Sequence, residues 1–168
     1  MLAIAALAAF AALLIYAAYS DVAGLIIPNW VSLALIGLFL PLAFAFGMPL
    51  AEIGAHLLFG FGLLAIGFFL FQANIIGGGD AKLLAASAVW TGFAAFTPFA
   101  VGTVLAGGVI ALALLVLRKL AGPREGLPAF VNRLLTPNTG VPYGAAIMLG
   151  GLMALPALPF AGNALTLP

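Results

Sequence analysis

The chain has 168 residues, of which 66% are hydrophobic and only 5% are charged, with a formal net charge of +1. Soluble domains carry about 25% charged residues, so this composition indicates that the chain is solvated by lipid. It excludes a cytosolic enzyme and a secreted disulfide scaffold, and the small net charge argues against a nucleic-acid binder. The chain has no cysteine, which removes thiolate nucleophiles and cysteine-based zinc sites.

Long uncharged stretches recur along the chain, and a transmembrane helix needs roughly 20 mostly apolar residues. We expect six such helices, with the fourth and fifth divided at Thr97-Pro98. The first stretch has no Lys or Arg before it, so we expect it to be a retained span and not a signal peptide. The expected fold is an all-α integral membrane protein with a single polytopic domain over residues 1–168. The expected spans are 2–19, 30–46, 53–72, 81–97, 99–117 and 143–160.

The connection at 118–142 carries four of the five basic residues of the chain and one acid, Glu125. Loops rich in Lys and Arg stay on the cytoplasmic side of a membrane, so we expect 118–142 to be a basic cytoplasmic loop. Alternating spans then place the loops 20–29 and 73–80 on the same side, and both termini outside. Lys82, the fifth basic residue, also falls on the inner side. The four basic residues of the loop are Arg118, Lys119, Arg124 and Arg133.

Two aspartates survive where lipid makes charge costly, and such residues are functional candidates. Asp21 closes the first span, and Asp80 follows three glycines just before the fourth. The expected topology places both carboxylates at the cytoplasmic end of the membrane. Two carboxylates that share a site cannot both ionise easily, so one can accept a proton from water while the other donates one to a carbonyl oxygen. Glycine beside Asp80 would allow a positive φ and the close approach of an extended substrate.

Each of these residues also has a purely structural interpretation. Asp80 is a suitable N-cap for the following helix, and Asp21 is suitable as an interfacial residue that faces water. Lys82 fits an interfacial anchor, or a cation that tunes the carboxylates. Glu52 and His56 have the spacing of a helical metal half-site, but two ligands are too few, and we expect a hydrogen-bonded structural pair on the outer side.

The pattern resembles the type IV prepilin peptidases, which are intramembrane aspartyl proteases with a Gly-x-Gly-Asp motif. Residues 77–82 match that motif and its continuation, and Asp21 lies upstream of an Ile-Pro-Asn turn at 27–29. The final span opens with Val-Pro-Tyr-Gly-Ala at 141–145, which is also similar to the family, so the resemblance extends over essentially the whole chain. The residues that support the motif are Gly77, Gly79, Lys82, Pro28 and Asn29.

The resemblance implies that Asp21 and Asp80 form a catalytic dyad. This dyad would cut the short basic leader from prepilin-like precursors at the cytoplasmic face of the bacterial inner membrane. The partners would be these precursors and the bilayer, with no cofactor and no nucleic acid. Larger members carry a cytoplasmic insertion with cysteine pairs and methylate the new N-terminus. This cysteine-free chain resembles the small branch of tight-adherence (Flp-type) pili, for which we do not predict methylation. Many members also have a basic residue just before Ile-Pro-Asn, where this chain has Gly24, Leu25 and Ile26.

Two other functions use the same residues. A small proton- or ion-coupled transporter would use the aspartates as an ion site, but it would place them near the midplane of the bilayer and often in repeated halves. A non-catalytic membrane assembly subunit would use both aspartates as capping residues.

Overall fold

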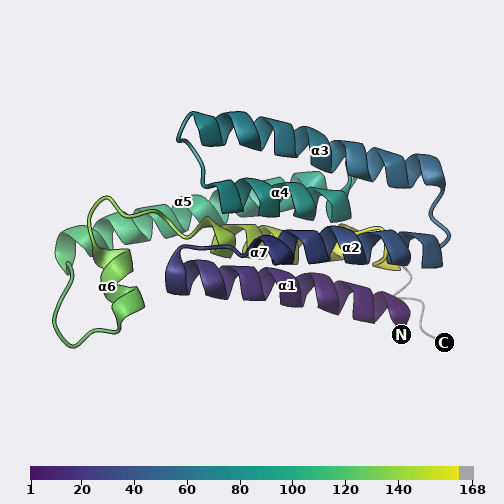
Figure 1. Cartoon of the computed structure of the whole chain (residues 1–168). Coiled ribbons are helices and arrows are strands. Elements are labelled where there is room, and N and C mark those ends of the chain that lie inside the picture. The colour runs from purple at the N-terminus through teal and green to yellow at the C-terminus, as the bar shows by residue number, and fades with distance from the viewer. Residues whose placement is uncertain (163–168) are drawn as a thin grey trace.

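A computed structural model describes residues 1–162, and every element in this range is helical. Figure 1 shows the long helices lying side by side along a common direction. The segment 163–168, which includes the C-terminus that we expect outside, lies beyond the described residues. The helices are α1 (Leu2–Gly24), α2 (Asn29–Ala45), α3 (Leu50–Gln72), α4 (Gly78–Thr91), α5 (Phe96–Leu120), α6 (Ala129–Leu135) and α7 (Tyr143–Ala154), followed by the 3-10 turn η1 (Leu155–Ala157).

All six expected apolar stretches are helical, but they differ in length. The helices α1, α3 and α5 have 23 to 25 residues and are long and apolar enough to cross a membrane. The helices α2 and α7 are apolar but shorter, and α4 has 14 residues. The chain is therefore an all-helical protein with at least three candidate membrane spans among its described residues, and the arrangement of six spans stays a prediction.

The boundary between α4 and α5 does not fall at the expected Thr97-Pro98. Helix α4 ends at Thr91, and Gly92 follows with a φ of 52°, a conformation that favours glycine. Helix α5 begins at Phe96 and contains Pro98 in its first turn. A proline there disrupts no hydrogen bond, because the first N–H groups of a helix have no intrahelical partner. Glycine, and not proline, marks the division.

The basic connection also has more structure than a loop. Helix α5 continues through Arg118, and the short helix α6 follows. The Arg118 guanidinium donates hydrogen bonds to the carbonyl of Leu134 (2.7 Å) and the hydroxyl of Thr139 (2.8 Å). Arg133 donates to the carbonyl of Ala23 in the last turn of α1 (2.9 Å). These bonds fold the connection back onto the ends of α1 and α5.

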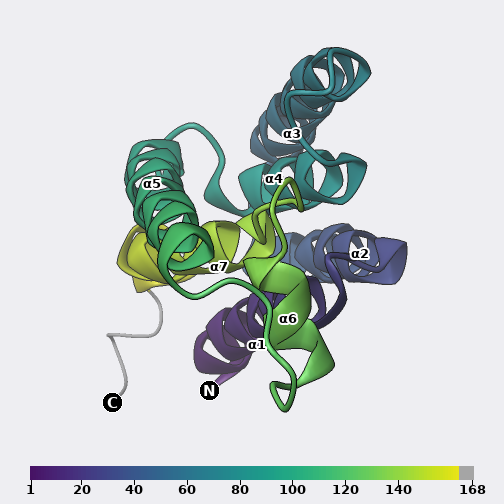
Figure 2. The same cartoon turned by 90° about the vertical axis from the view of Figure 1, so that its left-hand side faces the viewer.

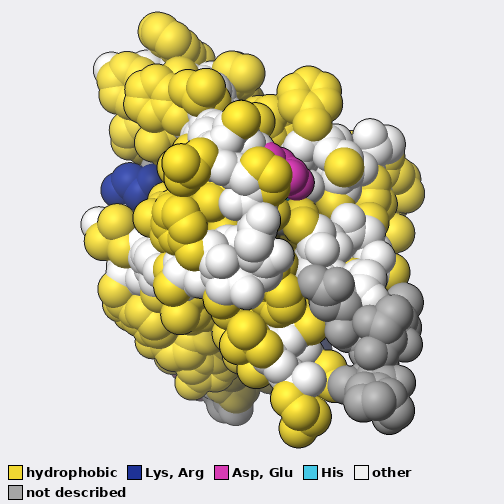
Figure 3. All heavy atoms as spheres, turned by 90° about the vertical axis from the view of Figure 1, so that its right-hand side faces the viewer, with side chains coloured by type: hydrophobic (Ala, Val, Ile, Leu, Met, Phe, Trp, Pro, Cys, Tyr) yellow, Lys and Arg dark blue, Asp and Glu magenta, His cyan; other side chains and the backbone are white. Residues whose placement is uncertain are grey.

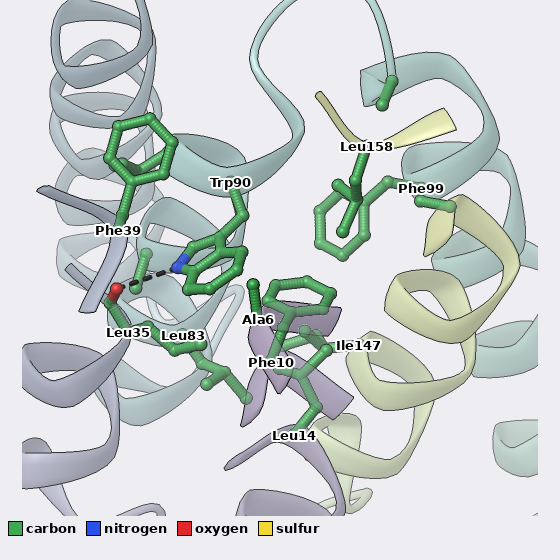
Figure 4. Close-up of a cluster of buried hydrophobic side chains, with 14 of the residues drawn as sticks. Ala6, Phe10, Leu14, Leu35, Phe39, Leu83, Trp90, Phe99, Ile147 and Leu158 are labelled. Atoms are coloured by element: carbon green, nitrogen blue, oxygen red, sulfur yellow. Dashed lines mark hydrogen bonds between the residues drawn. The ribbon is translucent and has the colours of Figure 1, made fainter. Parts of the chain in front are cut away.

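Helix α4 lies at the centre of the bundle, between α3 on one side and α2 and α7 on the other (Figures 1 and 2). Every residue from Ala85 to Thr91 is buried. Its Trp90 packs against Phe10 and Phe39, and the indole N–H donates to the carbonyl of Leu35 at 2.8 Å (Figure 4). Lys82 bonds to Asn29 nearer the start of the same two helices, so α2 and α4 run parallel.

The connections alternate between the two ends of the bundle. The turns that follow α1, α3 and α5 lie at the end that carries α6, and the turns that follow α2 and α4 lie at the opposite end (Figure 1). Figure 3 views that opposite end, where the described surface is mostly hydrophobic and few charged side chains are visible. The chain order therefore brings the ends of α1 and α5 and the start of α4 to one end of the molecule.

Candidate active site

Asp21 lies in the last turn of α1 and is 5% exposed. The helix buries residues three or four positions apart, including Phe10, Leu14 and Ala17, and Asp21 continues this buried stripe. The backbone N–H of Gly144, in the first turn of α7, donates to Asp21 Oδ2 at 2.7 Å. The interfacial interpretation of Asp21 is therefore wrong, because the carboxylate faces the inside of the bundle.

Asp80 is the third residue of α4 and lies in its first turn. The N-cap is Gly77, so the expectation that Asp80 caps the helix is off by three positions. Gly77 has a φ of −71°, and none of the three glycines has a positive φ. The expected left-handed backbone is therefore wrong. Glycine at position 77 instead allows the Asp80 carboxylate to lie close to the backbone, because a Cβ on Gly77 would lie 2.8 Å from Asp80 Oδ2.

Ile27 links the two carboxylates. It is buried, and a Cβ built on Gly79 would lie 3.1 Å from Ile27 Cβ, while one built on Gly144 would lie 3.2 Å from Ile27 Cδ1. Ile27 therefore fits between the residue that precedes Asp80 and the residue that binds Asp21. Its turn is defined by Leu25, in the left-handed conformation with a φ of 54°, and by Pro28, the extended N-cap of α2.

The remaining motif residues form one bond across two helices. The Lys82 ammonium donates to Asn29 Oδ1 at 2.9 Å, and this bond joins the second turn of α4 to the first turn of α2. Lys82 is exposed, which fits the expected position near an interface. Its partner among the described residues is Asn29, so the bond ties the Ile-Pro-Asn turn to the helix that carries Asp80.

Both carboxylates line one cavity of about 790 Å³. The cavity lies between α3 and α5, with Ala81 and Leu84 of α4 on its wall, and both Asp21 and Asp80 line it. The structure therefore brings together the two aspartates that the sequence singled out. A shared cavity with two carboxyl groups can hold a water molecule and a peptide bond between an acid and a base.

Glu52 and His56 lie near the start of α3, at the end of the bundle opposite the aspartates (Figure 1). His56 is buried, its Nδ1 lies 2.7 Å from the carbonyl oxygen of Val89, and its ring stacks on Phe39. Glu52 is exposed. The expected hydrogen bond between His56 and Glu52 is therefore wrong. His56 has a structural role, as expected, but its partner is the carbonyl of Val89 in the last turn of α4.

Two contacts near the aspartates were not predicted. Gly144 belongs to the motif at 141–145, but the sequence did not connect it with Asp21, which lies 123 positions away. Arg133 reaches the segment that precedes Ile-Pro-Asn from the distant helix α6. Its guanidinium bonds to Ala23, and Nη1 would lie 3.9 Å from a Cβ on Gly24. A cation from α6 therefore lies beside the end of α1.

The fold and the cavity define a helical membrane protein with two carboxylates at one end of its bundle. The family model described as "Type IV leader peptidase family" matches residues 8–112, which is more than half of the chain and includes both aspartates. The chain belongs to this family and is a leader-peptidase-like protease. No curated protein and no solved structure matches it.

Proposed function

We propose that the chain is an intramembrane aspartyl endopeptidase with a single six-span domain in the bacterial inner membrane. It removes the short leader peptide from prepilin-like precursors at the cytoplasmic face. The observation that carries this proposal is the shared cavity, in which Asp21 and Asp80 are the two carboxylates. Membership of the leader peptidase family supports the same reaction class.

The chemistry follows from two carboxyl groups in different protonation states. The ionised carboxylate takes a proton from water, whose oxygen attacks the scissile carbonyl carbon while the protonated carboxyl group gives its proton to the carbonyl oxygen. The tetrahedral intermediate then collapses: the C–N bond breaks while the carboxyl group that took the proton from water gives it to the leaving nitrogen, and the other carboxylate recovers its proton from a hydroxyl group of the intermediate. The products are a carboxylic acid and a free amine, with one water consumed.

The cytoplasmic location is supported by the position of the basic residues. Arg133 bonds to Ala23, two residues from Asp21, so the basic connection lies at the same end of the bundle as the carboxylates. Segments rich in Lys and Arg remain on the cytoplasmic side. A precursor leader is made in the cytoplasm, so a cleavage site at this end is where the enzyme meets it.

The transporter hypothesis is less consistent with the positions of the two aspartates. Asp21 lies in the last turn of α1 and Asp80 in the first turn of α4, at the ends of helices, whereas transporter ion sites often lie on broken helices. The test of the proposed function is co-expression of the chain with a precursor that has a short basic leader and an apolar helix. N-terminal sequencing of the product should find a new N-terminus at the boundary between leader and helix. Finding the intact leader in every precursor tested would contradict the proposal.

The three glycines before and within α4 should differ in their tolerance of alanine. Gly77→Ala places a Cβ 2.8 Å from Asp80 Oδ2 and should be the most damaging, with cleavage reduced about a hundredfold because the carboxylate is displaced. Gly79→Ala meets Ile27 at 3.1 Å and should be intermediate. A Cβ on Gly78 would lie 3.3 Å from the ring of Phe71, and this ring is exposed and can move. Cleavage by Gly78→Ala should therefore remain close to the wild-type rate.

The measurement is the rate of precursor cleavage, normalised to the amount of membrane-inserted protein. Equal activity in the three variants would show that the glycines are a linker with no part in the site. The expected order of sensitivity is Gly77, Gly79, Gly78, which follows the atoms that each added Cβ would meet.

The bond between Lys82 and Asn29 should affect cleavage through the position of Asp80. Lys82→Met and Asn29→Leu each remove the bond and should each lower kcat by about tenfold, because a small displacement of a reacting group is costly. Lys82→Arg keeps a donor and should retain most of the activity. If the two residues act as one unit, the double variant should be no worse than either single variant. Multiplied losses in the double variant would contradict this pairing.

A further inference from the structure

The cavity extends well beyond the carboxylates. On α5 it is lined by Phe96, Ala100, Thr103 and Val104, whose spacing places them on one face of the helix. On α3 it is lined on the facing side by residues that include Leu63, Ile66 and Leu70. Figure 2 shows α3 and α5 standing apart, with α4 and α7 between them. The two helices form the walls of an apolar groove, which we call the α3–α5 groove.

The α3–α5 groove begins at the aspartates. A Cβ on Gly107 of α5 would lie 2.9 Å from the ring of Tyr143, and Tyr143 precedes the glycine that bonds to Asp21. Phe96, at the start of α5, lines the other end of the groove. Gly107 and Phe96 lie eleven residue steps apart, which corresponds to about 16 Å at 1.5 Å per step. The groove therefore runs for about three helical turns from the carboxylates toward the opposite end of the bundle.

The groove is also open on its side. Val104 is 69% exposed although it lines the cavity, and Ile66 on the facing wall is 56% exposed. In a membrane, such side chains contact lipid or a helix that replaces lipid. A segment that reaches the carboxylates from the bilayer can therefore enter sideways between α3 and α5.

We propose that the α3–α5 groove binds the apolar helix of the precursor, on the side of the scissile bond away from the leader. This inference rests on the proposed function. Under the proposed function the part of the precursor beyond the scissile bond is an apolar helix, and the groove is an apolar surface continuous with the carboxylates. The leader lies at the other side of the scissile bond, at the end of the bundle that carries α6. The groove thereby sets the depth at which a precursor helix is held, and so which peptide bond reaches Asp21 and Asp80.

Two valines on α5 provide a matched test. Val104 lines the groove, whereas Val109 lines a separate shallow depression between α5 and α7. Their exposures are 69% and 68%, so the same substitution introduces similar bulk at each. Val104→Trp should raise KM for a precursor about tenfold or more, which corresponds to about 1.4 kcal/mol of lost binding, while Val109→Trp should stay near wild type. Equal KM values for the two variants would overturn the proposal.

Cross-linking tests the occupant directly, because the chain has no cysteine of its own. Val104→Cys and Val109→Cys are made in the Asp80→Asn background and oxidised with a precursor that has one cysteine in its apolar helix. We expect a disulfide to the precursor from position 104 and not from 109. Cross-linking of position 104 to a second copy of the chain, or no preference for 104 over 109, would show that the groove binds another helix or only lipid.

The cleavage assay distinguishes a failure of this inference from a failure of the proposed function. If the chain does not cleave precursors, the wild-type protein is inactive in the same assay. If the chain cleaves precursors but holds their helix elsewhere, the wild-type protein is active and both tryptophan variants match it. The cysteine variants change the groove by a small side chain, so they remain informative if Val104→Trp does not insert into the membrane.

Discussion

Replacing either aspartate by asparagine is expected to abolish leader cleavage. Asp21→Asn and Asp80→Asn keep the shape of the side chain and the ability to accept a hydrogen bond, but an amide cannot cycle a proton. General acid and base catalysis typically contributes a factor of about 10² to 10⁴, so each variant should fall below about a hundredth of wild-type activity. The measurement is the fraction of co-expressed precursor that is processed, judged by its shift on a gel.

The control for this prediction is the amount of protein in the membrane. Both variants should insert at near wild-type levels, because Asn can still accept the hydrogen bond from Gly144 at position 21. A variant that is well expressed and retains more than about a hundredth of the activity would exclude an aspartyl mechanism. The double variant should be no less active than the single variants, because the two groups act in one reaction.

Gly144→Ala should produce the second large loss. A Cβ at this position would lie 3.0 Å from both Cβ and Oδ2 of Asp21, and 3.2 Å from Cδ1 of Ile27. These atoms are buried, so the added methyl group must move either the carboxylate or the start of α7. A displacement of about 1 Å in a catalytic group can cost about a hundredfold, and we expect a fall in kcat of that order. The measurement is cleavage kinetics with purified protein in detergent or liposomes.

Gly54→Ala is the matched control for Gly144→Ala. Gly54 lies within α3, and a Cβ there would meet no atom within 4 Å. It should leave cleavage unchanged and raise helix stability slightly, because alanine favours the helix. If Gly144→Ala is as active as Gly54→Ala, the bond from the Gly144 N–H to Asp21 has no part in positioning the carboxylate.

Much of the helical arrangement follows from local sequence pattern. The apolar stretches predict the six main helices, and the basic connection predicts which ends lie together, because both signals depend on composition over many residues. The boundary between α4 and α5 was misplaced for a local reason. Pro98 looks like a helix stop, but it lies in the first turn of α5, and Gly92 ends α4.

In the candidate site, too, the sequence predicts the two aspartates but not the contacts around them. Asp21 and Asp80 stand out in the sequence because charge is rare in a chain of this composition. The contacts made at the end of α1 do not stand out: Gly144, which bonds to Asp21, and Arg133, which bonds to Ala23, come from segments more than 100 positions from α1. His56 shows the same limit: its spacing from Glu52 suggests a local partner, but it binds the distant Val89 across two packed helices.

The most direct test of the central claim uses purified protein reconstituted with a purified precursor that has a short basic leader and an apolar helix. Intact-mass spectrometry should detect two products whose masses sum to that of the precursor plus one water, which is the signature of peptide hydrolysis. The variant with Asp21→Asn and Asp80→Asn together should leave the precursor intact. Cleavage of equal extent by that double variant, or an intact precursor with well-folded wild-type protein, would contradict the assignment of the two aspartates as the hydrolytic pair.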